Sequence, residues 1–172
     1  EQGVINENIE FAPGTITDTN ADFIANELSP AITDDKLKTK QPFKSLVTSF
    51  YKACLTQKDV MNNQYQVNCI IDQLLTAINQ GVINDNIEFA TNDITNDNIN
   101  QITDVLTELI NRNSGLKDKP AYKSLVTSFY KACLTQKDVV DNDIIDKLSA
   151  AINQGVINDN IEFATNDITN DN

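Results

Sequence analysis

Long stretches of this sequence occur twice. The seventeen residues KSLVTSFYKACLTQKDV occupy positions 44–60 and again positions 123–139. The twenty-two residues AINQGVINDNIEFATNDITNDN occupy positions 77–98 and return at positions 151–172, and a diverged form of the same phrase begins at Gln2. Near-identical copies at a fixed period are typical of repeat proteins, in which one supersecondary unit recurs along the chain.

The glycines of the recurring phrase give the length of the unit. Successive copies are 78 and then 74 residues apart when counted between Gly3, Gly81 and Gly155. We therefore expect two repeat units and the start of a third, at residues 1–80, 81–154 and 155–172. Since residue 172 falls within a unit, we expect the sequence to be a window from a longer tandem array.

Apolar residues recur at helical spacing and predict a mainly α fold with roughly three helices in each unit. In the seventeen-residue block they recur at three- and four-residue steps after a proline that suits the first helical turn. Further helices are expected over residues 99–110, over a shorter stretch that stops before Pro30, and before Gly81 and Gly155, which suit a helix C-terminus. The residues expected in the core are Leu46, Phe50, Leu125 and Phe129.

Two local patterns concern the ends of these helices. Thr56 with Asp59, and Thr135 with Asp138, have the spacing of a capping box, which predicts a helix start at each place. Asp141 and Asp143 are the nearest paired carboxylates, and they too fall at a predicted helix start, where acidic residues are favourable. The Asn/Asp-rich segment at residues 81–96 and its equivalents fits both helical steps and strand alternation, so its structure stays open.

The chain is acidic, and its charge alternates along the sequence. The formal net charge is −12 at pH 7, which argues against binding to nucleic acid or to an anionic membrane surface. Residues 1–35 carry eight acidic and no basic residues, residues 36–58 carry six lysines and no acidic residue, and the alternation returns in the second unit. Two interpretations stay open. The charged blocks are solvated faces, or the basic helix of one unit contacts an acidic segment of another in an assembly. The expected assembly lysines are Lys44, Lys52, Lys58, Lys123, Lys131 and Lys137.

The sequence offers little catalytic chemistry. It has no histidine, which excludes His-based triads and nearly all catalytic zinc sites. The Asn/Asp tracts lack the order of an EF-hand, so at most weak, diffuse binding of divalent cations is expected there. No run of apolar residues is long enough to span a membrane, and no secretion signal opens the chain. We expect no enzyme activity, no cofactor and no membrane partner.

Three cysteines leave the redox state open. Cys54 and Cys133 hold the same position in the two copies, whereas Cys69 aligns with Asp143 and belongs to the first unit alone. A disulfide between Cys54 and Cys69 would close a short loop between two neighbouring helices. Cys133 would then be free or would bridge two chains. The alternative is that all three are small buried apolar residues in a reducing compartment.

Residues 98–152 resemble a stretch near the N-terminus of the neprilysin family of zinc metallopeptidases. A leucine-rich helix is followed by a polar loop and then by the aromatic-Tyr-Lys-x-Cys helix, here Phe129 to Cys133 and, in the first copy, Phe50 to Cys54. The resemblance implies an extracellular location. The His-Glu-x-x-His zinc motif of that family has no counterpart here, so no catalytic or metal-binding residue carries over.

These observations favour a structural protein. We expect tandem, acidic, helical modules of a longer secreted fibre, silk, matrix or adhesive that assembles with itself head to tail or laterally. Thr48, Ser49, Lys52 and Gln57 are expected at the surface, and their unaltered return in the second copy favours assembly. The alternative is a soluble helical module, derived from a neprilysin-like ectodomain without catalysis, that binds a peptide, protein or small ligand.

Overall fold

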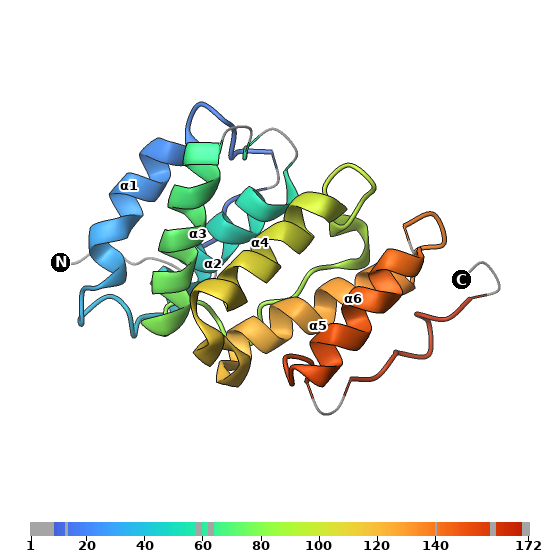
Figure 1. The fold of residues 1–172 in the computed structure, drawn as a ribbon. Coiled ribbons are helices and arrows are strands. Elements are labelled where there is room, and N and C mark those ends of the chain that lie inside the picture. Colours follow the sequence, from blue (N-terminus) through green and yellow to red (C-terminus); the bar gives the residue numbers. More distant parts are fainter. Residues whose placement is uncertain are drawn as a thin grey trace. The chain divides into compact units, whose positions relative to one another are not determined.

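The computed structural model describes residues 9–12, 14–57, 60–61, 64–139, 141–158 and 161–169. The described part is mainly helical, as predicted, with six α-helices, two short 3-10 turns and no β-strand among those residues (Figure 1). The chain forms two compact units, Glu1–Asn84 and Asp85–Asn172. They divide the chain four residues after the expected boundary at residue 80, and residues 155–172 belong to the second compact unit.

The first unit consists of α1 (Ala21–Ile32), α2 (Gln41–Thr56) and α3 (Gln64–Asn79). Helix α3 contacts both α1 and α2, and α1 and α3 run side by side in Figure 1. Their apolar faces meet in a core that excludes water, and burial of this kind supplies most of the stability of helices this short. The largest fully buried side chains of this core include Phe50, Tyr51, Leu55, Ile70 and Leu74.

The second unit is arranged around α5 (Pro120–Leu134), the helix with the most buried residues. Helix α5 contacts α6 (Asn142–Asn153) and the 3-10 turns η1 (Thr91–Asp93) and η2 (Ser114–Asp118), and α4 (Ile99–Arg112) contacts η2. Ten of the fifteen residues of α5 are buried. A helix that is buried on most of its circumference is the centre of its unit, and its polar side chains must find partners within the protein.

Several sequence predictions about the helices are confirmed. Pro42 and Pro120 lie in the first turn of α2 and α5. Gly81 and Gly155 follow α3 and α6 with φ of 71° and 73°. This left-handed conformation is one that glycine adopts without steric cost. Asp141 caps α6, since its side chain accepts a hydrogen bond from the Ile144 amide at 2.9 Å.

Two predictions about helix ends are wrong. Helix α1 continues past Pro30 to Ile32, which is 1 % exposed, so burial of Ile32 outweighs the hydrogen bond lost at the proline. The capping box at Thr135 is absent because the Thr135 hydroxyl donates back to the Lys131 and Ala132 carbonyls at 3.1 Å, and α6 begins only at Asn142. The Thr56 hydroxyl likewise donates to the Lys52 carbonyl at 2.9 Å, and its expected partner Asp59 lies outside the described residues.

The four residues expected in the core have different degrees of burial. Phe50, Leu125 and Phe129 are fully buried, whereas Leu46, the counterpart of Leu125, lies half-buried. Identical residues at equivalent positions of the two copies therefore differ in burial. The segment at residues 81–96, left open from the sequence, is neither α-helix nor strand but an irregular chain with the single turn η1.

Candidate functional site

Two non-helical segments lie against the central helix of each unit, α2 in the first and α5 in the second. We call residues 82–84 and 156–158 the closing segments, because each follows the last helix of its unit. We call residues 9–12 with 14–16, and residues 85–94, the opening segments, because each precedes the first helix of its unit. Both kinds come from the recurring phrase, so a single copy of the phrase supplies the end of one unit and the beginning of the next.

The closing segments are held by a threonine of the central helix. The Asn84 amide donates to the Thr48 hydroxyl at 2.9 Å, and the Asn158 amide donates to the Thr127 hydroxyl at the same distance. The residues before these asparagines are buried, with exposed fractions between 0 % and 8 % for Val82, Ile83, Val156 and Ile157. The threonine thus holds the segment that follows the last helix of each unit.

The opening segments are held by the neighbouring serine and by an aromatic contact. The Phe89 amide donates to the Ser128 hydroxyl at 2.9 Å, and the Phe89 ring packs edge-on against Phe129 with 6.4 Å between centroids. In the first unit the Phe11 amide donates to Ser49 at 3.0 Å. A buried amide without such an acceptor would be costly, so the serine is a structural requirement of the segment.

Further polar side chains of α5 and its end bind the opening segment of the second unit. Ser124 donates to the Asp85 carbonyl at 2.8 Å, and Gln136 donates to the Thr91 and Ile94 carbonyls at 2.6 and 3.0 Å. Ile94 at the end of this segment is fully buried. The segment is therefore anchored along its whole length, from its first residue to the turn before α4.

Several of the repeated polar residues form hydrogen bonds within their own unit, which corrects the prediction that they lie at the surface. Five of the positions expected at the surface bind the backbone of the two segments: Thr48, Ser49, Thr127, Ser128 and Gln136. The other three, Lys52, Gln57 and Lys131, are half-buried. Thr127 and Ser128 are only 9 % and 8 % exposed. The repetition of the threonine and the serine is therefore accounted for by the fold of the unit and is no longer an argument for assembly.

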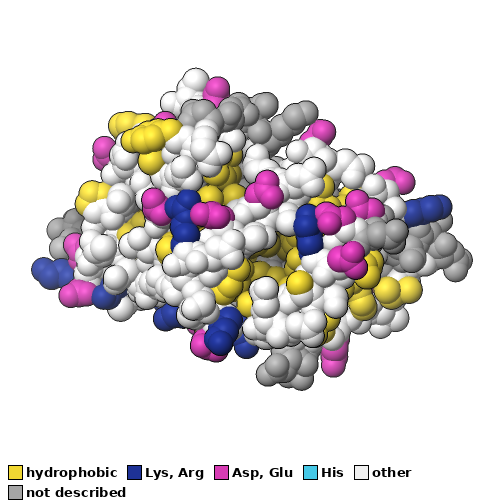
Figure 2. Space-filling view, viewed as in Figure 1, with side chains coloured by type: hydrophobic (Ala, Val, Ile, Leu, Met, Phe, Trp, Pro, Cys, Tyr) yellow, Lys and Arg dark blue, Asp and Glu magenta, His cyan; other side chains and the backbone are white. Residues whose placement is uncertain are grey.

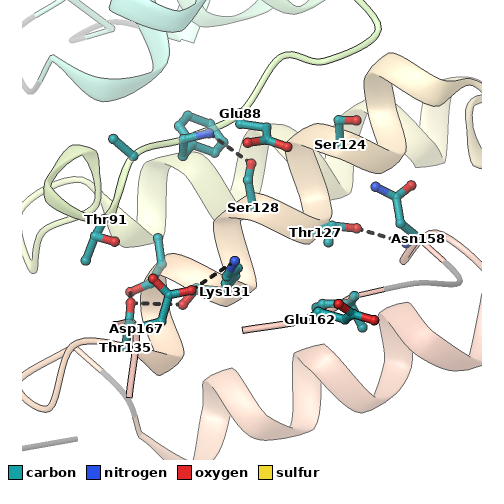
Figure 3. A pocket seen from close by; sticks show the side chains of 14 residues that line it. Glu88, Thr91, Ser124, Thr127, Ser128, Lys131, Thr135, Asn158, Glu162 and Asp167 are labelled. Atoms are coloured by element: carbon teal, nitrogen blue, oxygen red, sulfur yellow. Dashed lines mark hydrogen bonds and ion pairs between the residues drawn. The ribbon is translucent and has the colours of Figure 1, made fainter. Parts of the chain in front are cut away.

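A hollow of about 270 Å³ opens beside α5 in the second unit (Figure 3). Its walls are the opening segment around Glu88 and Thr91, the row of polar side chains on α5, and residues that follow the closing segment, among them Ile161 and Glu162. Figure 3 shows Ser124, Thr127, Ser128 and Lys131 along the side of α5 that faces this space. The hollow thus lies over the same helix face that binds the two segments.

One ion pair lies at the edge of this hollow. The Lys131 ammonium is 3.0 Å from a carboxylate oxygen of Asp167, which also accepts from the Ala164 amide at 2.6 Å. The hydrogen bond from Lys131, and then that from Ala164, lower the pKa of Asp167 below its usual 3.8. Lys131 also lies 6.0 Å from the centroid of the Phe163 ring.

The other predicted assembly lysines differ in exposure. Lys44, Lys52 and Lys123 are half-buried and Lys137 is exposed, whereas Lys58 lies outside the described residues. On the face in Figure 2, Asp and Glu side chains lie among Lys and Arg side chains rather than in separate areas. The role of the lysines in assembly stays a prediction.

All three cysteines are free thiols, so the disulfide between Cys54 and Cys69 is not formed in the structure. Cys54 is fully buried in the core, whereas Cys69 is half-buried and its side chain hydrogen-bonds to Tyr65. Cys133 is fully buried as well and cannot reach another chain while its unit stays folded. Burial raises the pKa of Cys54 and of Cys133 to about 12, so both are protonated and poorly nucleophilic at neutral pH.

A second hollow of about 280 Å³ lies between α4, α5 and α6. It is lined by side chains such as Leu106, Ile110, Val126 and Phe129. The Tyr122 hydroxyl at its wall donates to the Leu106 carbonyl at 2.7 Å, and burial raises the pKa of Tyr122. This hollow offers mainly apolar surface and is suited to a small apolar ligand.

No group of three or more His, Cys, Asp or Glu side chains within the described ranges is placed to hold a metal ion. Weak binding of divalent cations to the Asn/Asp tracts stays a prediction. None of the helices described is both long and apolar enough to cross a membrane.

Comparison with known proteins gives no relative. No family model, no curated protein and no solved structure matches this chain.

Proposed function

We propose that this chain is a structural, self-assembling repeat module of a longer secreted fibre, silk or matrix protein. One observation carries the proposal: the recurring phrase is divided between two compact units. Asn84 is anchored to Thr48 of the first unit, and the very next residue, Asp85, is anchored to Ser124 of the second. A phrase that ends one unit and begins the next joins units in series without a spacer.

Such a phrase suits an array of any length, because each added copy supplies both an end and a beginning. We propose that units of 74–78 residues with three helices each are the building blocks of this array. Their resemblance to the neprilysin family suggests that a non-catalytic helical piece was duplicated, and the extracellular location goes with that resemblance. Charge alternation along the sequence would then set the order of units in the assembled material.

Sedimentation and electron microscopy test this function. We expect the purified chain to associate at roughly 10 mM salt and to associate less at roughly 500 mM, because exposed charges are screened within a few ångströms at high ionic strength. Filaments with a regular axial repeat should be visible in native material. Dispersed monomers at both salt concentrations would contradict the proposal.

The mass of the intact native chain tests the array separately. We expect a mass several times that of the present 172 residues. A native chain of this length alone would refute the array, whether or not it associates.

A soluble binding module is the second candidate, and the apolar hollow between α4, α5 and α6 favours it. The test is a ligand screen monitored by NMR, with methyl groups of Leu106 and Val126 as reporters. Saturable shifts at these methyl groups, together with a chain that stays monomeric, would favour this candidate over the structural one.

A further inference from the structure

The apolar hollow between α4, α5 and α6 lies where two helices of the first unit pack together. Its lining residues all lie between Thr103 and Val156, so the hollow belongs to the second unit alone. In the first unit α1 packs against α3, whereas among the described residues the equivalent helices α4 and α6 pack together less closely. Two units with the same order of helices therefore differ at this place.

A tyrosine of the central helix has a hydrogen-bond partner here in one unit and not in the other. In the first unit the Tyr51 hydroxyl donates to the side-chain oxygen of Gln73 at 3.3 Å. Its counterpart Tyr130 lines the hollow of the second unit and is 7 % exposed. Within the part of the chain that the structure describes, the Tyr130 hydroxyl has no hydrogen-bond partner.

The missing partner follows from one difference between the copies. At the position of Gln73 the second copy has Lys147, which also lines the hollow. An amide oxygen accepts hydrogen bonds, whereas an ammonium group only donates them. The Lys147 ammonium lies 2.6 Å from a carboxylate oxygen of Asp143, one turn earlier in α6. Lys147 therefore cannot replace Gln73 as the acceptor for the tyrosine.

The Tyr130 hydroxyl is a hydrogen-bond donor at neutral pH. Burial, and then the nearby Cys133 and Asp143, raise the pKa of Tyr130 to about 12. Since no fully buried side-chain oxygen or nitrogen of the described residues lacks a hydrogen bond, this hydroxyl is not sealed in the core but adjoins open space. A largely buried donor without a partner is costly, so a ligand that brings an acceptor into the hollow is favoured.

The size and lining of the hollow define the rest of the ligand. Apolar surface comes from side chains such as Leu106, Val126 and Phe129. A cavity of about 150 Å³ admits benzene, so the hollow of about 280 Å³ admits a molecule of about ten non-hydrogen atoms. An ionised ligand would lose its hydration against this lining, and Lys147 is already paired with Asp143. The hollow is therefore suited to a neutral molecule.

We propose that this hollow binds a small neutral molecule with an apolar body and one oxygen acceptor, such as a ketone or an ester, and that the Tyr130 hydroxyl donates to that oxygen. This inference rests on the second candidate function, whose ligand class it names, and it does not require assembly. The first unit is not expected to bind the same ligand, because Tyr51 is already bound to Gln73 and α1 packs against α3.

Two probes of the same shape test the proposal. Acetophenone joins a benzene ring to one carbonyl oxygen, and α-methylstyrene has a methylene group in place of that oxygen. Each is titrated into the isotope-labelled full-length chain at high salt, and NMR follows the methyl groups. We expect saturable shifts at Val126 with acetophenone and none at Val47, its counterpart in the first unit. Absence of saturable shifts at Val126 would refute the inference.

The variant Tyr130→Phe tests the hydrogen bond itself. We expect it to bind acetophenone about fivefold more weakly than the wild type and α-methylstyrene equally well, because only the ketone accepts from the hydroxyl. Comparing both probes with both chains separates the hydrogen bond from the apolar contacts. Tyr51→Phe is the matched control and should leave both affinities unchanged. Equal binding of acetophenone by Tyr130→Phe and the wild type would overturn the inference.

A second variant gives Tyr130 the acceptor that its counterpart has. Lys147→Gln places an amide oxygen where the first unit has Gln73, so it should bind the Tyr130 hydroxyl and weaken acetophenone binding about fivefold. Binding of α-methylstyrene should change little. A variant that merely unfolds the second unit would lose both probes, so loss of acetophenone alone identifies the hydroxyl. An unchanged affinity for acetophenone would count against the inference.

Benzoate separates neutral from charged ligands, since it is an anion of similar size. We expect it to bind at least about tenfold more weakly than acetophenone, and equal or tighter binding would contradict the neutral ligand class. The result is distinguishable from that for assembly. Filaments without binding of acetophenone would refute the inference and leave the structural function standing. Saturable binding by a chain that stays monomeric would refute the structural function and support the inference.

Discussion

Phe89 and Phe163 have the same neighbours in sequence and different surroundings in the structure, which makes them a matched pair for mutation. We expect Phe89→Ala to destabilise the second unit strongly and Phe163→Ala to destabilise it much less. The helix propensities and the local sequence are identical at the two sites, so only tertiary packing can separate the two results.

The magnitude follows from burial. A phenylalanine buries roughly 200 Å², so the difference between 6 % and 42 % exposure amounts to roughly 70 Å², or about 2 kcal/mol. Phe89 also packs against Phe129, which is fully buried, so its removal leaves a cavity as well. We expect Phe89→Ala to lower the free energy of unfolding by about 3–5 kcal/mol, and Phe163→Ala by at least about 2 kcal/mol less.

The assay is urea unfolding followed by circular dichroism, at low protein concentration and high salt so that assembly does not contribute. Because the chain has two compact units, Phe89→Ala should shift the transition of the second unit and leave that of the first in place. Equal free energies of unfolding for the two variants would refute the assignment of the opening segment to the core of its unit.

Three further predictions test the local structure. Gly155→Ala should lower the free energy of unfolding by about 1 kcal/mol through backbone strain alone, since no atom lies within 4 Å of the added methyl group. Thermal unfolding measures this loss, and an unchanged free energy of unfolding would contradict the left-handed conformation of Gly155. Asp141→Ala should cost about 1 kcal/mol by removing the cap of α6, and faster amide exchange of Ile144 should accompany it; unchanged exchange would show that the cap contributes nothing. Under native conditions at pH 8 one thiol, that of Cys69, should react quickly with a disulfide reagent. Cys54 and Cys133 should react only after unfolding, because burial raises the pKa of both to about 12. Fast reaction of all three thiols would contradict the burial of Cys54 and Cys133.

Several features of the helix ends could be predicted from the sequence because they depend on local chemistry. The prolines at positions 42 and 120, the glycines at 81 and 155 and the cap at Asp141 act through their own backbone or a neighbour a few residues away. Their effect on the chain therefore does not depend on the rest of the fold. The spacing of apolar residues predicted the helices for the same reason, since helical periodicity is a property of each segment.

The opening and closing segments could not be predicted in this way. Phe89 and Ser128 are 39 residues apart in the chain, and only the fold brings them together. From the sequence alone, the repeated Thr and Ser of the central helices are expected at the surface, and the segment around Phe89 fits both helical steps and strand alternation.

The sequence by itself determined that the chain is repetitive, mainly helical and acidic, because composition and periodicity follow directly from the order of residues. The tertiary structure decided where one unit ends and the next begins, and which copy of IEFATNDIT is buried. The physical reason is that burial depends on which surface a segment meets. Identical residues at positions 87–95 and 161–169 therefore differ in exposure although they do not differ in sequence.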